Sequence, residues 1–146
     1  MKSLRILLSV SELHKDLGLL IVRLGIGLSI ALFHGFGKIK SDSEVWERLG
    51  RNMQNLGVDF VPVFWGFMAA FSEFFGSILI VLGIFFRPST LLLAFTMLVA
   101  AIRHLSLPAE AARSGWSGAS HALELLVIYV ALFIMGPGKY RIPSKW

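Results

Sequence analysis

The sequence predicts an all-α integral membrane protein, a four-helix bundle with a short amphipathic segment between the first and second spans. Three observations predict this fold class. Of the 146 residues, 55% are hydrophobic and 16% are charged, the mean hydropathy is +0.72, and the apolar residues gather in four long stretches. A chain of this size with such a composition is too apolar for a soluble domain.

Each of the four stretches is long enough to cross a bilayer as a helix. The hydrocarbon core is about 30 Å thick and each helical residue rises about 1.5 Å, so a span needs about 20 mostly apolar residues. The predicted spans cover residues 17–37, 60–86, 89–107 and 119–135.

Prolines mark the ends of these helices. Pro62 and Pro88 stand near the starts of the second and third spans, where a missing N–H costs least, and Pro137, between two glycines, ends the fourth. We expect an amphipathic lead-in at 1–16, one membrane domain at 17–140 and a tail at 141–146.

The connection between the first two spans, residues 41–59, is polar but carries apolar residues at helical spacing. This pattern favours a short helix that lies in the headgroup layer or caps the bundle. An ordinary solvated loop is the alternative. The apolar residues are Val45, Trp46, Leu49, Met53 and Leu56.

The net charge of +5 has a membrane explanation. Most Lys and Arg residues lie in the tails and connections, where they meet anionic lipid headgroups, so we expect a lipid bilayer and no nucleic acid as partner. The chain has no cysteine, which excludes disulfides and thiol exchange of its own. The motifs GxxxxGK[ST], HExxH and GxSxG are also missing.

The distribution of cations predicts the orientation. Seven lie in the tails and the loop at Arg87, against five on the other side, so we expect both termini in the cytoplasm. The seven are Lys2, Arg5, Lys15, Arg87, Lys139, Arg141 and Lys145, and the five are Lys38, Lys40, Arg48, Arg51 and Arg113.

Ionisable residues interrupt the spans. A charge at the centre of a bilayer costs about 2.5–3.5 kcal/mol, so such residues are expected to face the bundle interior. Alternate helices run in opposite directions, which brings most of these residues toward one side of the membrane, with Arg23 and Glu73 deeper. We predict a polar intramembrane pocket formed by Arg23, His34, Lys38, Glu73, Arg103, His104, His121 and Glu124. The structural alternative is that Arg23 pairs with Glu73, and Arg103 with Glu124, to hold the helices in register.

The sequence leaves more than one ligand open for this pocket. Three histidines could ligate a metal or haem, but Lys38 and Arg103 beside them disfavour a divalent ion, so we expect no metal and find haem the weaker option. A quinone headgroup needs donors to its carbonyls and an ionisable neighbour. His34, His121 and Glu124 could serve it, with Arg103 as an electrostatic donor.

Three segments resemble the DoxX family of small bacterial membrane proteins. They are RLGIGLSIALFHGFGK at 23–38, SEFFGSILIVLGIFFR at 72–87 and GPGKY at 136–140. The family residues carried over are Arg23, His34, Gly35, Lys38, Glu73, Arg87, Gly136 and Gly138. Where the family often has paired glycines after the glutamate, this chain has Gly76 and Ser77.

The resemblance implies a multi-pass protein of the bacterial inner membrane with a redox-linked role. The function expected first is a quinone-associated oxidoreductase subunit, or its membrane scaffold, with redox enzyme subunits as partners and a homo-oligomer as a further option. The alternative is a non-catalytic assembly or anchoring protein. A small transporter subunit fits less well, because one four-span unit has little room for alternating access.

Overall fold

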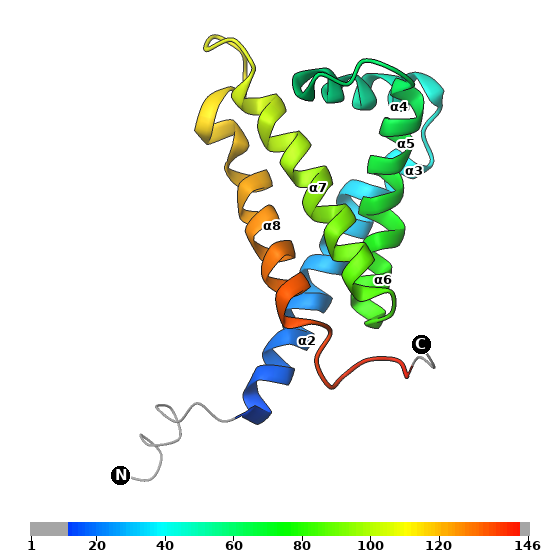
Figure 1. The fold of residues 1–146 in the computed structure, drawn as a ribbon, viewed down its shortest axis with the longest axis vertical. Coiled ribbons are helices and arrows are strands. Elements are labelled where there is room, and N and C mark those ends of the chain that lie inside the picture. The colour runs from blue at the N-terminus through cyan, green and yellow to red at the C-terminus, as the bar shows by residue number, and fades with distance from the viewer. Residues whose placement is uncertain (1–11, 144–146) are drawn as a thin grey trace.

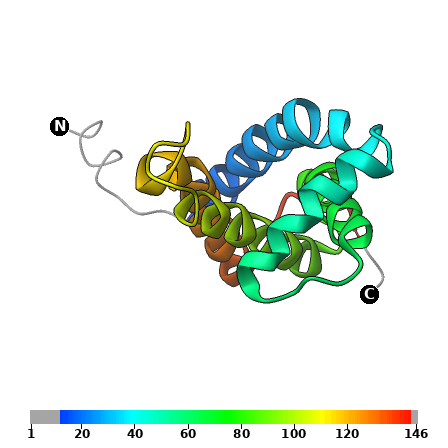
Figure 2. The same ribbon diagram turned by 90° about the horizontal axis from the view of Figure 1, so that it is seen from above.

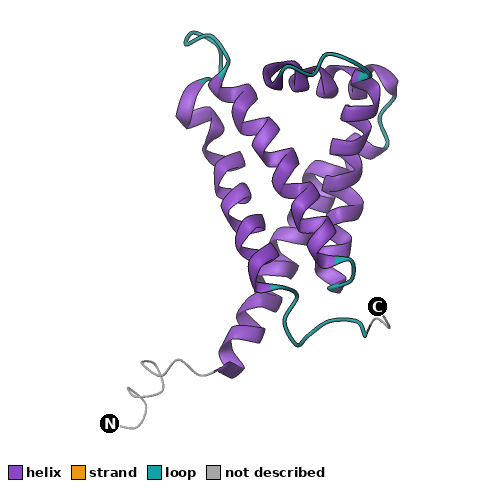
Figure 3. Ribbon diagram, in the orientation of Figure 1, coloured by secondary structure: helices purple, strands orange, loops and turns teal. Residues whose placement is uncertain are grey.

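The computed structural model describes residues 12–143, and within that range it is built from helices joined by short loops (Figures 1 and 3). Two of the long helices each contain a short π-helical segment, η1 in the first span and η3 in the second. The helix α4 continues into the 3₁₀ helix η2. In chain order the elements are α2 (Glu12–Ser29), η1 (Ile30–Gly35), α3 (Phe36–Ile39), α4 (Ser43–Gly50), η2 (Arg51–Leu56), α5 (Pro62–Phe71), η3 (Ser72–Gly76), α6 (Ser77–Leu82), α7 (Phe86–Leu105) and α8 (Gly115–Met135).

Four continuous helices are long and apolar enough to cross a membrane, which confirms the predicted fold class. They are His14–Ile39, Pro62–Leu82, Phe86–Leu105 and Gly115–Met135.

The ends of the spans differ from the prediction by a few residues. The second span stops at Leu82 because Gly83 takes a left-handed conformation, with φ 74°. The backbone N–H groups of Gly83 and Ile84 then donate to the carbonyl of Leu79, which closes the helix. The third helix therefore begins at Phe86, three residues earlier than predicted.

The connection at 41–59 is helical, so the solvated-loop alternative is wrong. Asp42 begins α4 by accepting a hydrogen bond from the backbone N–H of Val45 at 3.1 Å. Figures 1 and 2 show α4 lying across the end of the bundle, over α5. Glycines allow this close crossing, since a Cβ on Gly66 would meet the carbonyl oxygen of Trp46.

The bundle is held by a small buried core where the long helices meet. α7 packs along α8, and α2 packs against α6. The core is formed mainly by Ile30, Ile80, Phe86, Leu93, Met97, Leu125, Tyr129 and Leu132.

The first residues of α2, the α6–α7 loop and the segment after α8 lie at one end of the bundle, and α4 and the α7–α8 loop lie at the other (Figure 1). Residues 1–11 of the predicted lead-in and 144–146 of the predicted tail lie outside the described residues, and residues 12–16 form the start of α2. Which end faces the cytoplasm stays a prediction.

Candidate functional site

Two π-helical turns face each other at the centre of the site. η1 in the first span packs against η3 in the second, and Gly35 makes the approach close, because a Cβ there would lie 2.5 Å from the backbone nitrogen of Phe74. The wider winding of a π turn displaces the side chains around it and is frequent at functional sites. His34 lies in η1 and Glu73 in η3.

Lys38 and Glu73 form an ion pair beside these turns. The Lys38 Nζ donates to both carboxylate oxygens of Glu73, at 2.7 and 2.6 Å. The Glu73 side chain is 6% exposed and that of Lys38 is 31% exposed, so the carboxylate is enclosed while the lysine stem reaches it from the end of the span. The indole Nε1 of Trp46 donates to the Lys38 carbonyl at 2.8 Å and fixes the end of α3.

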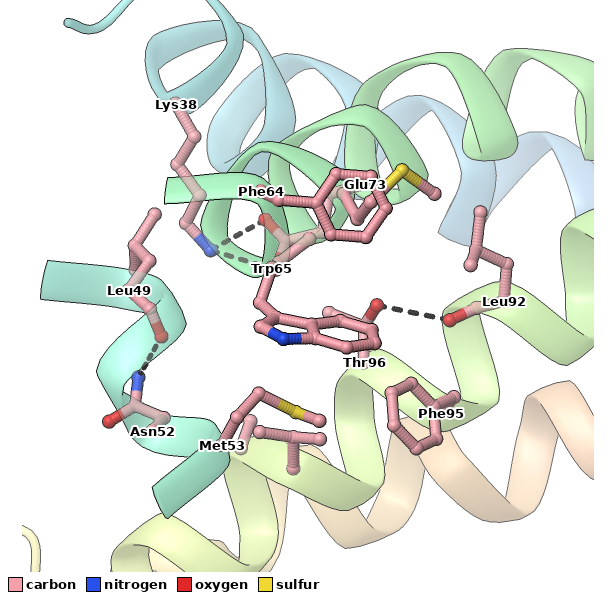
Figure 4. Close-up of a pocket in the computed structure, with 14 residues that line it drawn as sticks. Lys38, Leu49, Asn52, Met53, Phe64, Trp65, Glu73, Leu92, Phe95 and Thr96 are labelled. Carbon is pink, nitrogen blue, oxygen red and sulfur yellow. Dashed lines mark hydrogen bonds and ion pairs between the residues drawn. The ribbon is translucent and has the colours of Figure 1, made fainter. Parts of the chain in front are cut away.

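The ion pair closes one end of an apolar cavity of about 310 Å³, the first cavity. Leu49, Asn52 and Met53 cover it from the α4–η2 segment. Phe64 and Phe95 also line it and are 51% and 40% exposed, so the cavity reaches the lipid-facing surface between α5 and α7. Figure 4 shows Trp65 lying between the ion pair and the α7 residues Phe95 and Thr96.

The other side of the same ion pair borders a polar cavity of about 510 Å³, the second cavity. Lys38, Glu73 and Ala100 line both cavities. His34 and His121 stack in the second cavity with ring centroids 5.7 Å apart, and His104 Nδ1 lies 2.8 Å from the carbonyl oxygen of Arg113. The ion pair thus lies between an apolar space and a histidine-lined polar one.

Arg23 is placed differently from the prediction. It is 1% exposed, and its guanidinium donates to the carbonyls of Ile80 at 2.9 Å, Val81 at 2.8 Å and Pro137 at 2.7 Å, and also to that of Tyr140. The predicted Arg23–Glu73 pair is therefore wrong. Arg23 lies level with Ile80, seven residues beyond Glu73 along the second span, which at about 1.5 Å per residue is a separation of about 10 Å.

The predicted Arg103–Glu124 pair is also wrong. Both residues are exposed, and the ion pairs formed within residues 14–143 are Lys38–Glu73 and Arg51–Glu47. Glu124 lines a groove that adjoins the second cavity, since Ile30, His121 and Leu125 line both. Arg103 lines neither the cavities nor that groove. Of the eight predicted residues, the structure brings five around the two cavities: His34, Lys38, Glu73, His104 and His121.

Several lining residues were not predicted as part of a site. Trp65 was assigned to no site, and Met53 was assigned only to the apolar face of the predicted helix between the first two spans. The spacing of Leu49 and Met53 was the available signal, since an apolar helix face must cover something. Nothing in the sequence indicated that Thr96 would line the same cavity.

The sequence of the membrane domain matches one family model. The DoxX model matches residues 18–105, which is more than half of the chain. The chain belongs to the DoxX family. No curated protein and no solved structure matches it.

The structure shows what the GPGKY segment of this DoxX protein contacts. The backbone of the GPGKY segment supplies two of the Arg23 acceptors, the carbonyls of Pro137 and Tyr140, although Gly136 and Gly138 lie outside the matched residues. Both glycines have positive φ, 76° and 73°, which lets the chain turn back toward Arg23. Arg87, by contrast, is exposed at the start of α7.

Among the side chains of residues 14–143, no group of three or more His, Asp or Glu is arranged to hold a metal ion. His34 and His121 stand together, and the other ionisable residues that line the second cavity are Lys38, Glu73, His104 and Arg113. The lining of the first cavity is instead apolar with one charged end.

Proposed function

We propose that the first cavity binds the headgroup of a membrane quinone and that the chain works as a small redox-linked subunit of the bacterial inner membrane. The observation that carries the proposal is the Lys38–Glu73 pair, which closes an apolar cavity that reaches the lipid-facing surface. Quinones are amphiphiles with a polar headgroup and an apolar tail, so they enter such sites from the bilayer.

The residues around the cavity fit this ligand. Lys38 has three N–H donors and gives two hydrogen bonds to Glu73, which leaves one donor for a headgroup carbonyl. Trp65 and Phe64 supply flat apolar walls for a ring, and the volume lies at the lower end of the range for small-molecule sites.

A bound quinone supplies two-electron, two-proton redox chemistry at its carbonyls. The Lys38 ammonium stabilises negative charge that develops on a carbonyl oxygen beside it, and it needs no reorganisation to do so, because Glu73 already holds it in place. Glu73 can hold a proton at its carboxylate. It also borders the second cavity, where His34 and His121 can accept a proton from it through water.

The arrangement also supports a role beside other proteins. The chain has no cysteine and so no dithiol of its own, and the electrons are in this proposal exchanged with a redox enzyme subunit bound to this chain. We place both termini on the cytoplasmic side, on the distribution of Lys and Arg.

Quinone retention tests the proposal. We expect the full chain, purified from its native membrane in a mild detergent, to carry close to one quinone per chain by extraction and mass spectrometry. Replacing Lys38 and Glu73 together by methionine removes the polar end of the cavity and should lower the retained quinone about tenfold or more, since hydrogen bonds to charged groups contribute about 1.5–3 kcal/mol.

Glu47→Gln is the matched control. Glu47 belongs to the exposed ion pair with Arg51 on the outer face of α4, so this variant should retain quinone like the parent. If the parent carries no quinone, or if the double methionine variant retains as much as the parent, the proposal is wrong and a non-catalytic assembly role is the better description.

A further inference from the structure

A carboxylate lies near the middle of the fourth span and faces outward. Glu124 is the tenth of the 21 residues of α8, its side chain is exposed, and it forms no hydrogen bond or ion pair with any of residues 14–143. A lipid-facing charge at this depth is costly, and ionisable residues inside membranes almost always face protein or water. The isolated chain therefore leaves this group without the environment that it needs.

Glu124 lines a groove of about 280 Å³ between α2 and α8. Ser29 of α2 and His121 of α8 line the same groove, and both side chains carry hydrogen-bond donors. Ser29 is exposed and, like Glu124, takes part in no side-chain hydrogen bond with residues 14–143. The groove therefore holds an acceptor and donors that the chain itself does not pair.

The two spans on either side of the groove are also less buried by the rest of the protein than the other two spans. In the most apolar window of each span, the buried share is 22% for the first and 28% for the fourth, against 39% for the second and third. Gly25 lines the groove, and a Cβ added there would meet no atom within 4 Å. Together with Ser29, four residues later, it leaves room for the backbone of another helix to approach.

We infer that a second copy of this chain packs into the α2–α8 groove around a two-fold axis along the membrane normal. Such an axis places each residue at the same depth as its equivalent in the other copy. His121 and Glu124 are one helical turn apart on α8, a rise of about 4.5 Å. Glu124 of one copy can then accept a hydrogen bond from His121 or Ser29 of the other, and the reverse contact forms by symmetry.

A second copy is favoured over other occupants because the groove already contains both an acceptor, Glu124, and donors, His121 and Ser29. Acyl chains offer no donor to Glu124, and a foreign helix would have to supply its own. The inference does not depend on quinone binding, since none of Gly25, Ser29, His121 and Glu124 lines the first cavity. His121 also lines the second cavity, but Gly25, Ser29 and Glu124 line neither cavity.

Subunit counting in liposomes tests this interface. We expect the fluorescently labelled full chain to show two-step photobleaching at protein-to-lipid ratios where a monomeric membrane protein shows one step. Glu124→Ala should weaken dimerisation about tenfold, because interhelical hydrogen bonds in membranes contribute about 0.6 kcal/mol on average and two symmetric contacts are lost. Gly25→Leu should weaken it as well, by filling the groove.

Two matched variants control for general effects of substitution. Glu110→Ala removes an exposed carboxylate from the α7–α8 loop, and Gly37→Leu adds a side chain where a Cβ also meets no atom. Both should dimerise like the parent, and circular dichroism should show that all four variants are folded. A monomeric parent, an unchanged dimer in Glu124→Ala, or a cross-link from the groove to a different protein in native membranes would overturn the inference.

Discussion

Replacing Arg23 by leucine should lower the free energy of unfolding by about 3–5 kcal/mol. The guanidinium satisfies the carbonyls of Ile80 and Val81 at the end of α6 and two carbonyls of the segment after α8. Each buried acceptor left without a donor costs about 1–3 kcal/mol, and some of the four will find other partners. Denaturation by SDS in mixed micelles, followed by circular dichroism, measures the change.

The size of this effect follows from where Arg23 lies. A cation at the C-terminal end of α6 meets the negative end of the helix dipole as well as the carbonyls of Ile80 and Val81. Arg23→Lys keeps the charge but loses the planar fork that reaches several carbonyls at once, so it should recover only part of the stability.

Arg87→Leu provides the matched control for Arg23. Arg87 is a family residue of the same type, but it is exposed and its side chain makes no hydrogen bond to residues 14–143. Its replacement should change the free energy of unfolding by no more than about 0.5 kcal/mol. If Arg23→Leu were as stable as Arg87→Leu, Arg23 would not hold the bundle together as described.

Replacing only Lys38 of the Lys38–Glu73 pair should lower the free energy of unfolding more than replacing both residues. Lys38→Met leaves the enclosed Glu73 carboxylate without a partner and should cost about 3–5 kcal/mol. Glu73→Met should cost less, because the partly exposed Lys38 can turn its ammonium group to water. The double methionine variant should lie close to the parent, since replacing a buried ion pair by apolar side chains is often neutral or stabilising.

A double-mutant cycle in SDS denaturation measures this coupling. The exposed Glu47–Arg51 pair serves as the comparison, with an expected coupling of about 0.3–0.5 kcal/mol. Additive effects of the two methionine substitutions would show that Lys38 and Glu73 do not act as a pair. A stable double variant also provides the folded protein that the quinone experiment needs.

The sequence predicted the spans because hydropathy is a local property. Four apolar stretches of sufficient length leave few alternatives in a bilayer, and the helical spacing of Leu49 and Met53 indicated the helical cover over α5. The helix ends were less predictable. The end of the second span depends on the backbone conformation of Gly83 and on Arg23, which comes from a different helix.

The partners of the buried charges could not be read from the sequence. Charge and approximate depth suggested that Arg23 pairs with Glu73, but the sequence does not show which backbone carbonyls are left free at the end of a helix. It also does not show the π-helical turns η1 and η3, or that Gly35 packs closely against the backbone of Phe74 between them. Lys38 lay at the end of its span, and its long side chain brings its charge back to Glu73.

Photolabelling with an azido-quinone tests most directly whether the cavity beside Lys38 and Glu73 binds a quinone headgroup. The full chain in native membranes would be irradiated with and without excess unlabelled quinone, and the modified peptides would be mapped by mass spectrometry. We predict that the label falls within residues 49–69 and 92–100 and that it is displaced by competitor and lost in the double methionine variant. Label that resists competition, or that falls on the α2–α8 groove instead, would contradict the proposed site.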